Sequence, residues 1–225
     1  MAWRSSGSTN AALIENLAAN GLITSARVRQ AMMKVDRAHY APSLPYQDSP
    51  QPIGHRATIS APHMHAAACE SLLPFLKPGA KVLDVGSGSG YLTHVLAELI
   101  QPGGTVVGLE HIQALADLGA GNTAKSSEGK KLLDEGGIVY VKGDGRRGWT
   151  GKGGEEGFDA IHVGAAAAGW HQELIDQLKK PGRLFIPVAE GYLQYIYVVD
   201  KDEQGNVTKK KEMGVQYVPL TDAPE

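Results

Sequence analysis

A glycine-rich turn between an apolar run and a helical pattern is the feature that most limits how this chain can fold. Residues 82–93 read VLDVGSGSGYLT, so a strand-like stretch leads into three alternating glycines and then into helical spacing. The next apolar run ends at Glu110, twenty residues past Gly90. A strand, a glycine turn, a helix and a second strand ending in an acid make up a nucleotide-binding βαβ unit. We therefore predict a parallel α/β core around this unit.

The rest of the chain extends this pattern to a whole domain. The apolar runs VLDV, TVVGLE, IVYVK, FDAIHV and RLFIPV alternate with longer segments, and their two-sided apolar character predicts a doubly wound, mostly parallel sheet. Helical patterns precede the sheet, and apolar runs at 192–199 and 213–220 flank Gly205-Asn206, which predicts a C-terminal antiparallel hairpin. We expect one domain, 1–225, made of a helical and loop extension (1–78), a Rossmann-like core (79–190) and the hairpin (191–225). The Gly- and Lys-rich stretches 119–137 and 149–157 are predicted to be surface loops.

An acid before the glycines identifies the ligand of the turn. Asp84 would repel a pyrophosphate but would attract a ligand that carries an ammonium and a sulfonium. We therefore predict a site for S-adenosyl-L-methionine rather than NAD, with Gly86, Gly88 and Gly90 letting the backbone approach the ligand. Glu110 should accept both ribose hydroxyls.

Two further elements should lie at the same edge of the sheet. Gly143-Asp144-Gly145 follows the run IVYV, and a carboxylate there can accept a hydrogen bond from the adenine amine. The small residues of 162–167 follow the run FDAI and leave space for a substrate. A plain Asp-Gly turn and close helix–sheet packing are the structural alternatives.

The stretch ATISAPHMHA (57–66) brings a serine to the start of a helix that begins with Pro62. Ser60 is either a helix cap or part of an anion site, because free N–H groups at a helix N-terminus suit a carboxylate. His63 and His65 lack a third nearby ligand, so we expect no metal. A serine hydrolase is disfavoured because the chain has no GxSxG elbow.

Composition narrows the class of protein. The net charge of −2 gives no broad reason to bind nucleic acid, and the single cysteine excludes an intrachain disulfide. The first residues lack the apolar region of a secretory signal, and no window approaches the roughly 20 apolar residues of a membrane span. We expect a cytosolic protein without membrane contact, and a monomer because no long exposed apolar segment requires a partner.

Taken together, these residues resemble the protein-L-isoaspartate (D-aspartate) O-methyltransferase family, eukaryotic type, along nearly the whole chain. ISAPHMHA and VPLT are specific to that family, whereas the glycine turn is shared by the wider class of S-adenosylmethionine-dependent enzymes. The matching stretches are Met1-Ala2-Trp3, DRAHYAP (36–42), PYQDSPQPIG (45–54), ATISAPHMHA (57–66), LDVGSGSGYLT (83–93), VKGDGR (141–146), DAIHVGAAA (159–167), LIDQLKKPGRLFIPV (174–188) and MGVQYVPLTD (213–222).

The resemblance implies a reaction and a set of residues. Family members methylate the free α-carboxylate of L-isoaspartyl and D-aspartyl residues in damaged proteins, which starts repair through a succinimide and leaves S-adenosyl-L-homocysteine. The active-site serine corresponds to Ser60. The substrate peptide is expected at Ser60, Ala165, Val218, Pro219 and Leu220. The cofactor contacts correspond to Ala57, Thr58, Ile59, Ser60, His65, Ser89, Glu110, His111, Gly143, Asp144 and Thr221.

Some features leave alternatives open. Vertebrate-type relatives end in a Trp- and Arg-containing tail, whereas this sequence stops at Asp222-Ala223-Pro224-Glu225, so we expect a cofactor contact carried by that tail to be missing. The alternatives are a methyltransferase for RNA or a small molecule, a non-catalytic module that binds S-adenosylmethionine, and an NAD-dependent dehydrogenase.

Overall fold

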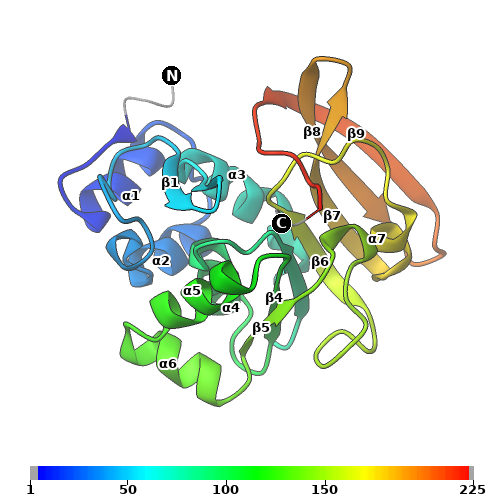
Figure 1. Cartoon of the computed structure of the whole chain (residues 1–225), viewed down its shortest axis with the longest axis horizontal. Helices are drawn as coiled ribbons and strands as arrows, with labels where there is room; N and C mark the ends of the chain where they lie inside the picture. The colour runs from blue at the N-terminus through cyan, green and yellow to red at the C-terminus, as the bar shows by residue number, and fades with distance from the viewer. Residues whose placement is uncertain (1–4, 223–225) are drawn as a thin grey trace.

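The structure is a computed structural model that describes residues 5–222, so the Met1-Ala2-Trp3 match lies outside the described residues. Its centre is a seven-stranded sheet with the order β5-β4-β3-β6-β7-β8-β9 (Figure 1). The first five strands in this order are parallel, and β8 and β9 are antiparallel. The predicted sheet and C-terminal hairpin are therefore confirmed. The strands are β3 (Lys81–Val85), β4 (Thr105–Glu110), β5 (Ile138–Lys142), β6 (Phe158–Val163), β7 (Leu178–Glu190), β8 (Leu193–Lys201) and β9 (Val207–Val215).

One face of the sheet is covered by most of the helices, which lie together on one side of it in Figure 1. Alternate strand residues such as Val82, Val106 and Ile138 pack there against buried side chains of these helices. The resulting core is shared between the N-terminal segments and the sheet. The elements are α1 (Asn10–Ala19), α2 (Ala26–Lys34), η2 (Arg37–His39), α3 (Pro62–Leu72), η3 (Leu73–Phe75), α4 (Tyr91–Leu99), α5 (Gln113–Thr123) and α6 (Ser127–Asp134).

The opposite face is covered by α7 (Gln172–Asp176) and by the segment that contains η4 (Gly145–Arg147). Leu83, Val85 and Val107 pack there against Leu174 and Ile175 of α7. Strand residues thus point alternately to two apolar layers, which is why the parallel strands β3, β4, β5 and β6 read as mostly apolar runs.

A small hairpin, β1 (Gln51–Gly54) and β2 (Ala57–Ile59), interrupts the segment between the first helices and the sheet. The predicted helical and loop extension therefore also contains two short strands. His55 and Arg56 form the turn, and both have positive φ, at 50° and 57°. Such values are uncommon for residues other than glycine.

Two local predictions were wrong. Residues 119–137 are largely helical, since they include the end of α5 and the whole of α6. Gly119 lies within α5, where the ring of Tyr140 occupies the space that a Cβ would need. The second hairpin strand runs over Val207–Val215 rather than 213–220. The predicted loop at 149–157 is confirmed.

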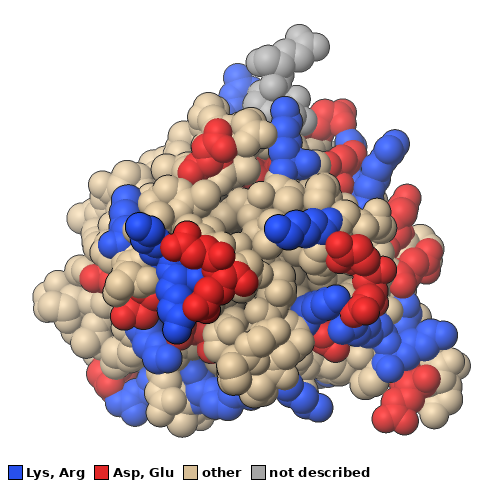
Figure 2. Space-filling view, turned by 90° about the horizontal axis from the view of Figure 1, so that it is seen from below, with Lys and Arg blue, Asp and Glu red and all other residues tan. Residues whose placement is uncertain are grey.

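Lys and Arg side chains lie interspersed with Asp and Glu on the face shown in Figure 2. This mixture matches the small net charge of the chain. Within residues 5–222, none of the helices has the length and apolar character needed to cross a membrane.

Candidate active site

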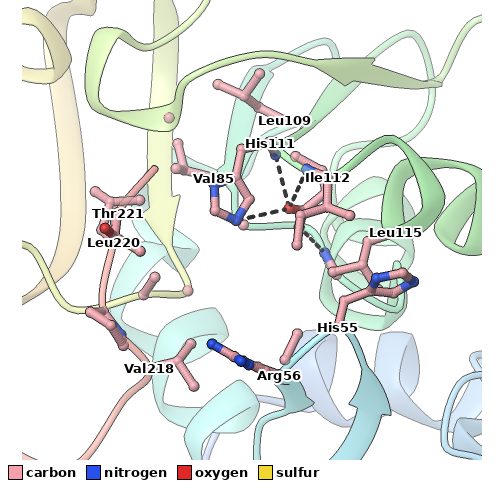
Figure 3. A pocket seen from close by; sticks show the side chains of 18 of the residues that line it. His55, Arg56, Val85, Leu109, His111, Ile112, Leu115, Val218, Leu220 and Thr221 are labelled. Atoms are coloured by element: carbon pink, nitrogen blue, oxygen red, sulfur yellow. Dashed lines mark hydrogen bonds and ion pairs between the residues drawn. The ribbon is translucent and has the colours of Figure 1, made fainter. Parts of the chain in front are cut away.

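A cavity of about 370 Å³ opens at the carboxyl ends of the parallel strands. In Figure 3, Val218, Leu220 and Thr221 lie on one side of it, and His111, Ile112 and Leu115 lie on the other. This is the edge of an open α/β sheet where ligands bind. The lining residues are His55, Arg56, Ala57, Thr58, Val85, Gly86, Gly88, Leu109, Glu110, His111, Ile112, Leu115, Gly145, Gly164, Ala165, Val218, Pro219, Leu220, Thr221 and Asp222.

The glycine turn forms part of the cavity wall. Gly86, Gly88 and Gly90 have φ values of 75°, 51° and 85°, a region that residues with a side chain rarely adopt. A Cβ at Gly90 would lie 2.4 Å from the Tyr140 hydroxyl oxygen. The turn after β3 therefore requires glycine at this position for both conformation and space.

Glu110 lies at the end of β4 and is only 4 % exposed. Its Oε2 accepts the Gly88 N–H at 3.0 Å, and its Oε1 accepts the N–H groups of His111 (2.8 Å) and Ile112 (3.1 Å). A carboxylate offers about four acceptor positions, so these bonds hold Glu110 in place and leave acceptor capacity on the cavity side. The predicted ribose contact is compatible with this arrangement.

Asp84 lies below the turn rather than on the cavity wall. Its carboxylate accepts from the Thr93 hydroxyl at 2.6 Å and from His162 Nδ1 at 2.7 Å, and the residue is 1 % exposed. Buried acceptors are normally paired in this way, so Asp84 has a structural role between β3, β6 and α4. Its predicted contact with the cofactor stays a prediction.

Asp144 precedes η4 and faces Arg146. The Asp144 side chain accepts the Arg146 N–H at 3.0 Å, and the guanidinium pairs with its carboxylate, which holds the pKa of Asp144 below its usual value. The same guanidinium pairs with Asp222. Arg146 thus connects the turn after β5 to the C-terminal segment beside the cavity.

The C-terminal segment, defined as residues 216–222, forms the outer cavity wall through main-chain contacts. Ala166 N–H donates to the Val218 carbonyl, and Leu220 N–H donates to the Ala166 carbonyl, both at 2.8 Å. The Gln194 side chain accepts the Tyr217 N–H at 2.6 Å and donates to the Tyr217 carbonyl at 3.2 Å. The main-chain bonds to Ala166 thus hold VPLT next to the loop after β6, and the Leu220 side chain adds packing against the core.

Ser60 lies in the turn between β2 and α3 and is half-buried. The N-cap of α3 is Ala61, without a side-chain capping bond, so the helix-cap interpretation of Ser60 is wrong. The N–H of His63, expected to be free for an anion, donates to Asp48 at 3.0 Å. The Ser60 carbonyl accepts from Arg37 at 2.8 Å.

The predicted contact residues divide into two groups. Those that line the cavity are Ala57, Thr58, Gly86, Gly88, Glu110, His111, Ala165, Val218, Pro219, Leu220 and Thr221. Those that lie behind it or beside it are Ile59, Ser60, His65, Asp84, Ser89, Gly90, Gly143 and Asp144.

Sequence reasoning did not identify His55, Arg56, Ile112 and Leu115 as cavity residues. Ile112 and Leu115 follow Glu110 at the start of a helix. Their position in the βαβ unit, just after the strand end, could therefore have indicated that they lie at the cavity. His55 and Arg56 carried no signal, because their positive φ is not evident from their residue types. Among residues 5–222, no group of three or more His, Cys, Asp or Glu side chains is arranged to bind a metal ion.

The cavity residues fit S-adenosylmethionine. The volume lies in the range of roughly 300–1,000 Å³ that is usual for small-ligand pockets. Leu109, Ile112 and Leu115 give an apolar wall for a purine ring, and Glu110 is a carboxylate within reach of ribose hydroxyls. The backbone at Gly86 and Gly88 has no side chain that would keep the ligand at a distance.

Comparisons with known proteins assign the family. The model of the protein-L-isoaspartate(D-aspartate) O-methyltransferase family matches residues 8–225. The chain is 46% identical to a protein-L-isoaspartate O-methyltransferase of Caenorhabditis elegans over 225 residues, covering 100% of this chain and 98% of the relative. It is 47% identical to protein-L-isoaspartate O-methyltransferase 1 of Arabidopsis thaliana over 219 residues, covering 96% and 93% of the two chains.

A crystal structure from Plasmodium falciparum, described as a protein-L-isoaspartate O-methyltransferase in complex with S-adenosyl-L-homocysteine, superimposes with a TM-score of 0.87. It is 35% identical and covers 96% of this chain and 99% of that chain. The match of the family model over residues 8–225 includes the glycine turn, the Ser60 turn and the C-terminal segment. The chain therefore belongs to the protein-L-isoaspartate (D-aspartate) O-methyltransferase family.

Proposed function

We propose that this protein transfers the methyl group of S-adenosylmethionine to the free α-carboxylate of L-isoaspartyl and D-aspartyl residues in damaged peptides and proteins. The observation that carries the proposal is the cavity between the glycine turn and the C-terminal segment. One wall of this cavity fits the cofactor, and the other consists of the VPLT main chain that distinguishes the family. Full-length relatives of the same name, at 46% and 47% identity, support the assignment.

The reaction requires positioning more than acid–base chemistry. When bound, S-adenosylmethionine supplies an electrophilic methyl group, and an α-carboxylate, with a pKa of about 3.5, is already ionised to receive it. The residues of this chain therefore need to hold the acceptor in line and to exclude water. Orientation of this kind is worth up to about 7–11 kcal/mol. The Ser60 hydroxyl is the donor that we assign to the carboxylate, and small residues at Gly164 and Ala165 leave room for it.

Substrate selection is expected to rest on the peptide main chain. A peptide laid beside Val218 and Leu220 would add to an extended segment and would tolerate many side chains. The Val218 carbonyl and the Leu220 N–H are already paired with Ala166. Because main-chain groups alternate in direction along a strand, the peptide has to use the opposite edge, where Pro219 offers only its carbonyl. Few main-chain bonds then form, so we expect weak and broad peptide binding.

The proposal is tested with two peptides that differ only in one Asp or isoAsp linkage. We expect methyl ester to form on the isoaspartyl peptide, because only that linkage leaves a free α-carboxylate at the kink. The assay follows transfer of labelled methyl groups and uses a panel of RNA as a further acceptor. Comparable rates on both peptides would refute the selectivity. Transfer to RNA alone would favour an RNA methyltransferase, and cofactor binding without any methylated product would favour a non-catalytic module.

Replacing Ser60 by alanine should slow turnover about tenfold while S-adenosylhomocysteine affinity stays within about threefold. Loss of one hydrogen bond to a charged group costs about 1.5 kcal/mol or more, and other groups still hold the cofactor. Steady-state kinetics with the isoaspartyl peptide and calorimetry with S-adenosylhomocysteine measure the two quantities. The assigned role is wrong if affinity for S-adenosylhomocysteine collapses while turnover per bound cofactor is unchanged.

The finer features of the assignment stay predictions. That the enzyme works in the cytosol as a monomer, without nucleic acid or membrane, rests on its composition alone.

A further inference from the structure

Arg37 is a cation without exposed surface, located in η2 between the N-terminal helices and the β1–β2 hairpin. Burial lowers the pKa of its guanidinium to about 10. Its Nε atom is buried and has no hydrogen-bond partner. Removing a cation from water costs several kcal/mol, which the fold has to recover through well-placed partners. The contacts of Arg37 therefore indicate what its charge does.

Two of these contacts reach residues of the predicted site. Nη2 donates to the Ser60 carbonyl at 2.8 Å, and Nη1 lies 3.3 Å from Nδ1 of His65. A guanidinium can only donate, so His65 Nδ1 has to be the acceptor. Burial, together with the charge of Arg37, holds the pKa of His65 well below its usual value. His65 is therefore a neutral imidazole with its ring proton on Nε2.

The charge of Arg37 is not matched by a carboxylate in contact. Among residues 5–222, no Asp or Glu forms an ion pair with Arg37. Asp48 is the carboxylate whose charge acts on it, but Asp48 Oδ1 accepts both the His63 N–H at 3.0 Å and His63 Nδ1 at 2.8 Å. The other Asp48 oxygen is buried without a partner. A positive charge thus lies directly behind the Ser60 turn.

We infer that Arg37 is a positioning residue for a ligand carboxylate. It holds the Ser60 turn through its carbonyl, it makes His65 a donor through Nε2–H, and it adds positive charge behind both groups. Two ligands of the proposed reaction carry a carboxylate, namely the methionine half of the cofactor and the isoaspartyl residue. Only the peptide source rests on the proposed function, because cofactor binding can be measured without any methyl transfer.

The first test requires no substitution. Long-range ¹H–¹⁵N correlation spectra of the wild-type protein at neutral pH should show neutral His65 with its proton on Nε2. A proton on Nδ1, or a doubly protonated ring, would overturn the inference, because Arg37 then cannot donate to His65. This readout does not depend on ligand or activity.

The second test compares ligands with and without the carboxylate in Arg37→Met. Calorimetry gives the affinities for S-adenosylhomocysteine and its decarboxylated analogue, and competition assays give those for the isoaspartyl peptide and the same peptide with an α-carboxamide. We expect the preference for the carboxylate to fall about tenfold in one pair, the size of one lost charged hydrogen bond. The ligand pair whose preference falls shows whether Arg37 positions the carboxylate of the cofactor or that of the peptide. The inference would be overturned if Arg37→Met lost the same affinity for both ligands of each pair, or lost no affinity for any of them.

Two further variants separate charge from packing. Arg37→Lys keeps the cation. On a logarithmic scale, it should recover at least half of the preference for the carboxylate that Arg37→Met loses. Arg27→Met is the matched control, because the Arg27 guanidinium also donates to main-chain carbonyls, those of Leu76 and Leu99, away from the site. The control should leave both preferences unchanged. If Arg37→Met does not fold, the His65 proton position in the wild type decides.

Discussion

Replacing Glu110 by alanine should weaken binding of S-adenosylhomocysteine by about 2–3 kcal/mol, or roughly 30- to 150-fold. The variant removes the carboxylate that we predict to accept the ribose hydroxyls, and it also leaves the N–H groups of Gly88, His111 and Ile112 without their acceptor. Unpaired buried donors cost about 1–3 kcal/mol of stability in addition. Isothermal calorimetry measures the affinity, and thermal unfolding shows how much folded protein remains.

A ligand pair separates the two effects of this variant. Wild-type protein should prefer S-adenosylhomocysteine over its 2′,3′-dideoxy analogue, whereas Glu110→Ala should bind both with similar affinity. Glu110→Gln keeps the shape and one acceptor oxygen, so its affinity for S-adenosylhomocysteine should lie between those of the wild type and Glu110→Ala. Unchanged affinity of Glu110→Ala for S-adenosylhomocysteine would remove this residue from the cofactor site.

Replacing Gly90 by alanine should lower the free energy of unfolding by about 2–5 kcal/mol. A residue with a side chain at φ 85° costs about 1–2 kcal/mol, and the added methyl group would lie 2.4 Å from the Tyr140 hydroxyl and 2.9 Å from Gly119 Cα. The overpacking forces neighbouring groups to shift, which further destabilises the folded state by about 1–3 kcal/mol. Urea denaturation of the variant and the wild type measures the difference.

The chain offers a matched control for this substitution. Gly121 lies in α5 without positive φ, and a Cβ there meets no atom within 4 Å. Gly121→Ala should therefore be neutral or should stabilise the protein by about 0.5–1 kcal/mol. A Gly90→Ala protein as stable as Gly121→Ala would show that α4 and α5 can separate enough to admit the methyl group.

The fold could be predicted from the sequence because its signals are local. The apolar runs and the glycine turn give the parallel strands, and both rest on patterns of fewer than about ten residues. The extent of α5 and α6 could not be predicted in this way. Gly119 suggested a loop, whereas it is required by a tertiary contact with Tyr140, a residue of the neighbouring strand.

The site was predictable where a residue reaches the cavity from a strand end, as Glu110 does. It was less predictable where a polar residue could turn toward the cavity or away from it. Asp84 follows the alternation of β3 to the helix-covered side, where Thr93 and His162 occupy its oxygens. Arg37 lies in the family-matching stretch DRAHYAP, but its role could not be predicted, because that role arises from contacts with residues far away in the sequence.

The C-terminal segment also has a consequence for how the protein matures. Residues 216–222 follow every helix and strand in chain order, yet they supply one wall of the cavity. While a ribosome still holds this stretch in its exit tunnel, the sheet can form but the pocket stays open on that side. Synthesis from the N-terminus therefore separates formation of the sheet from closure of the pocket in time, and the methyl donor can be held only once this stretch has left the tunnel.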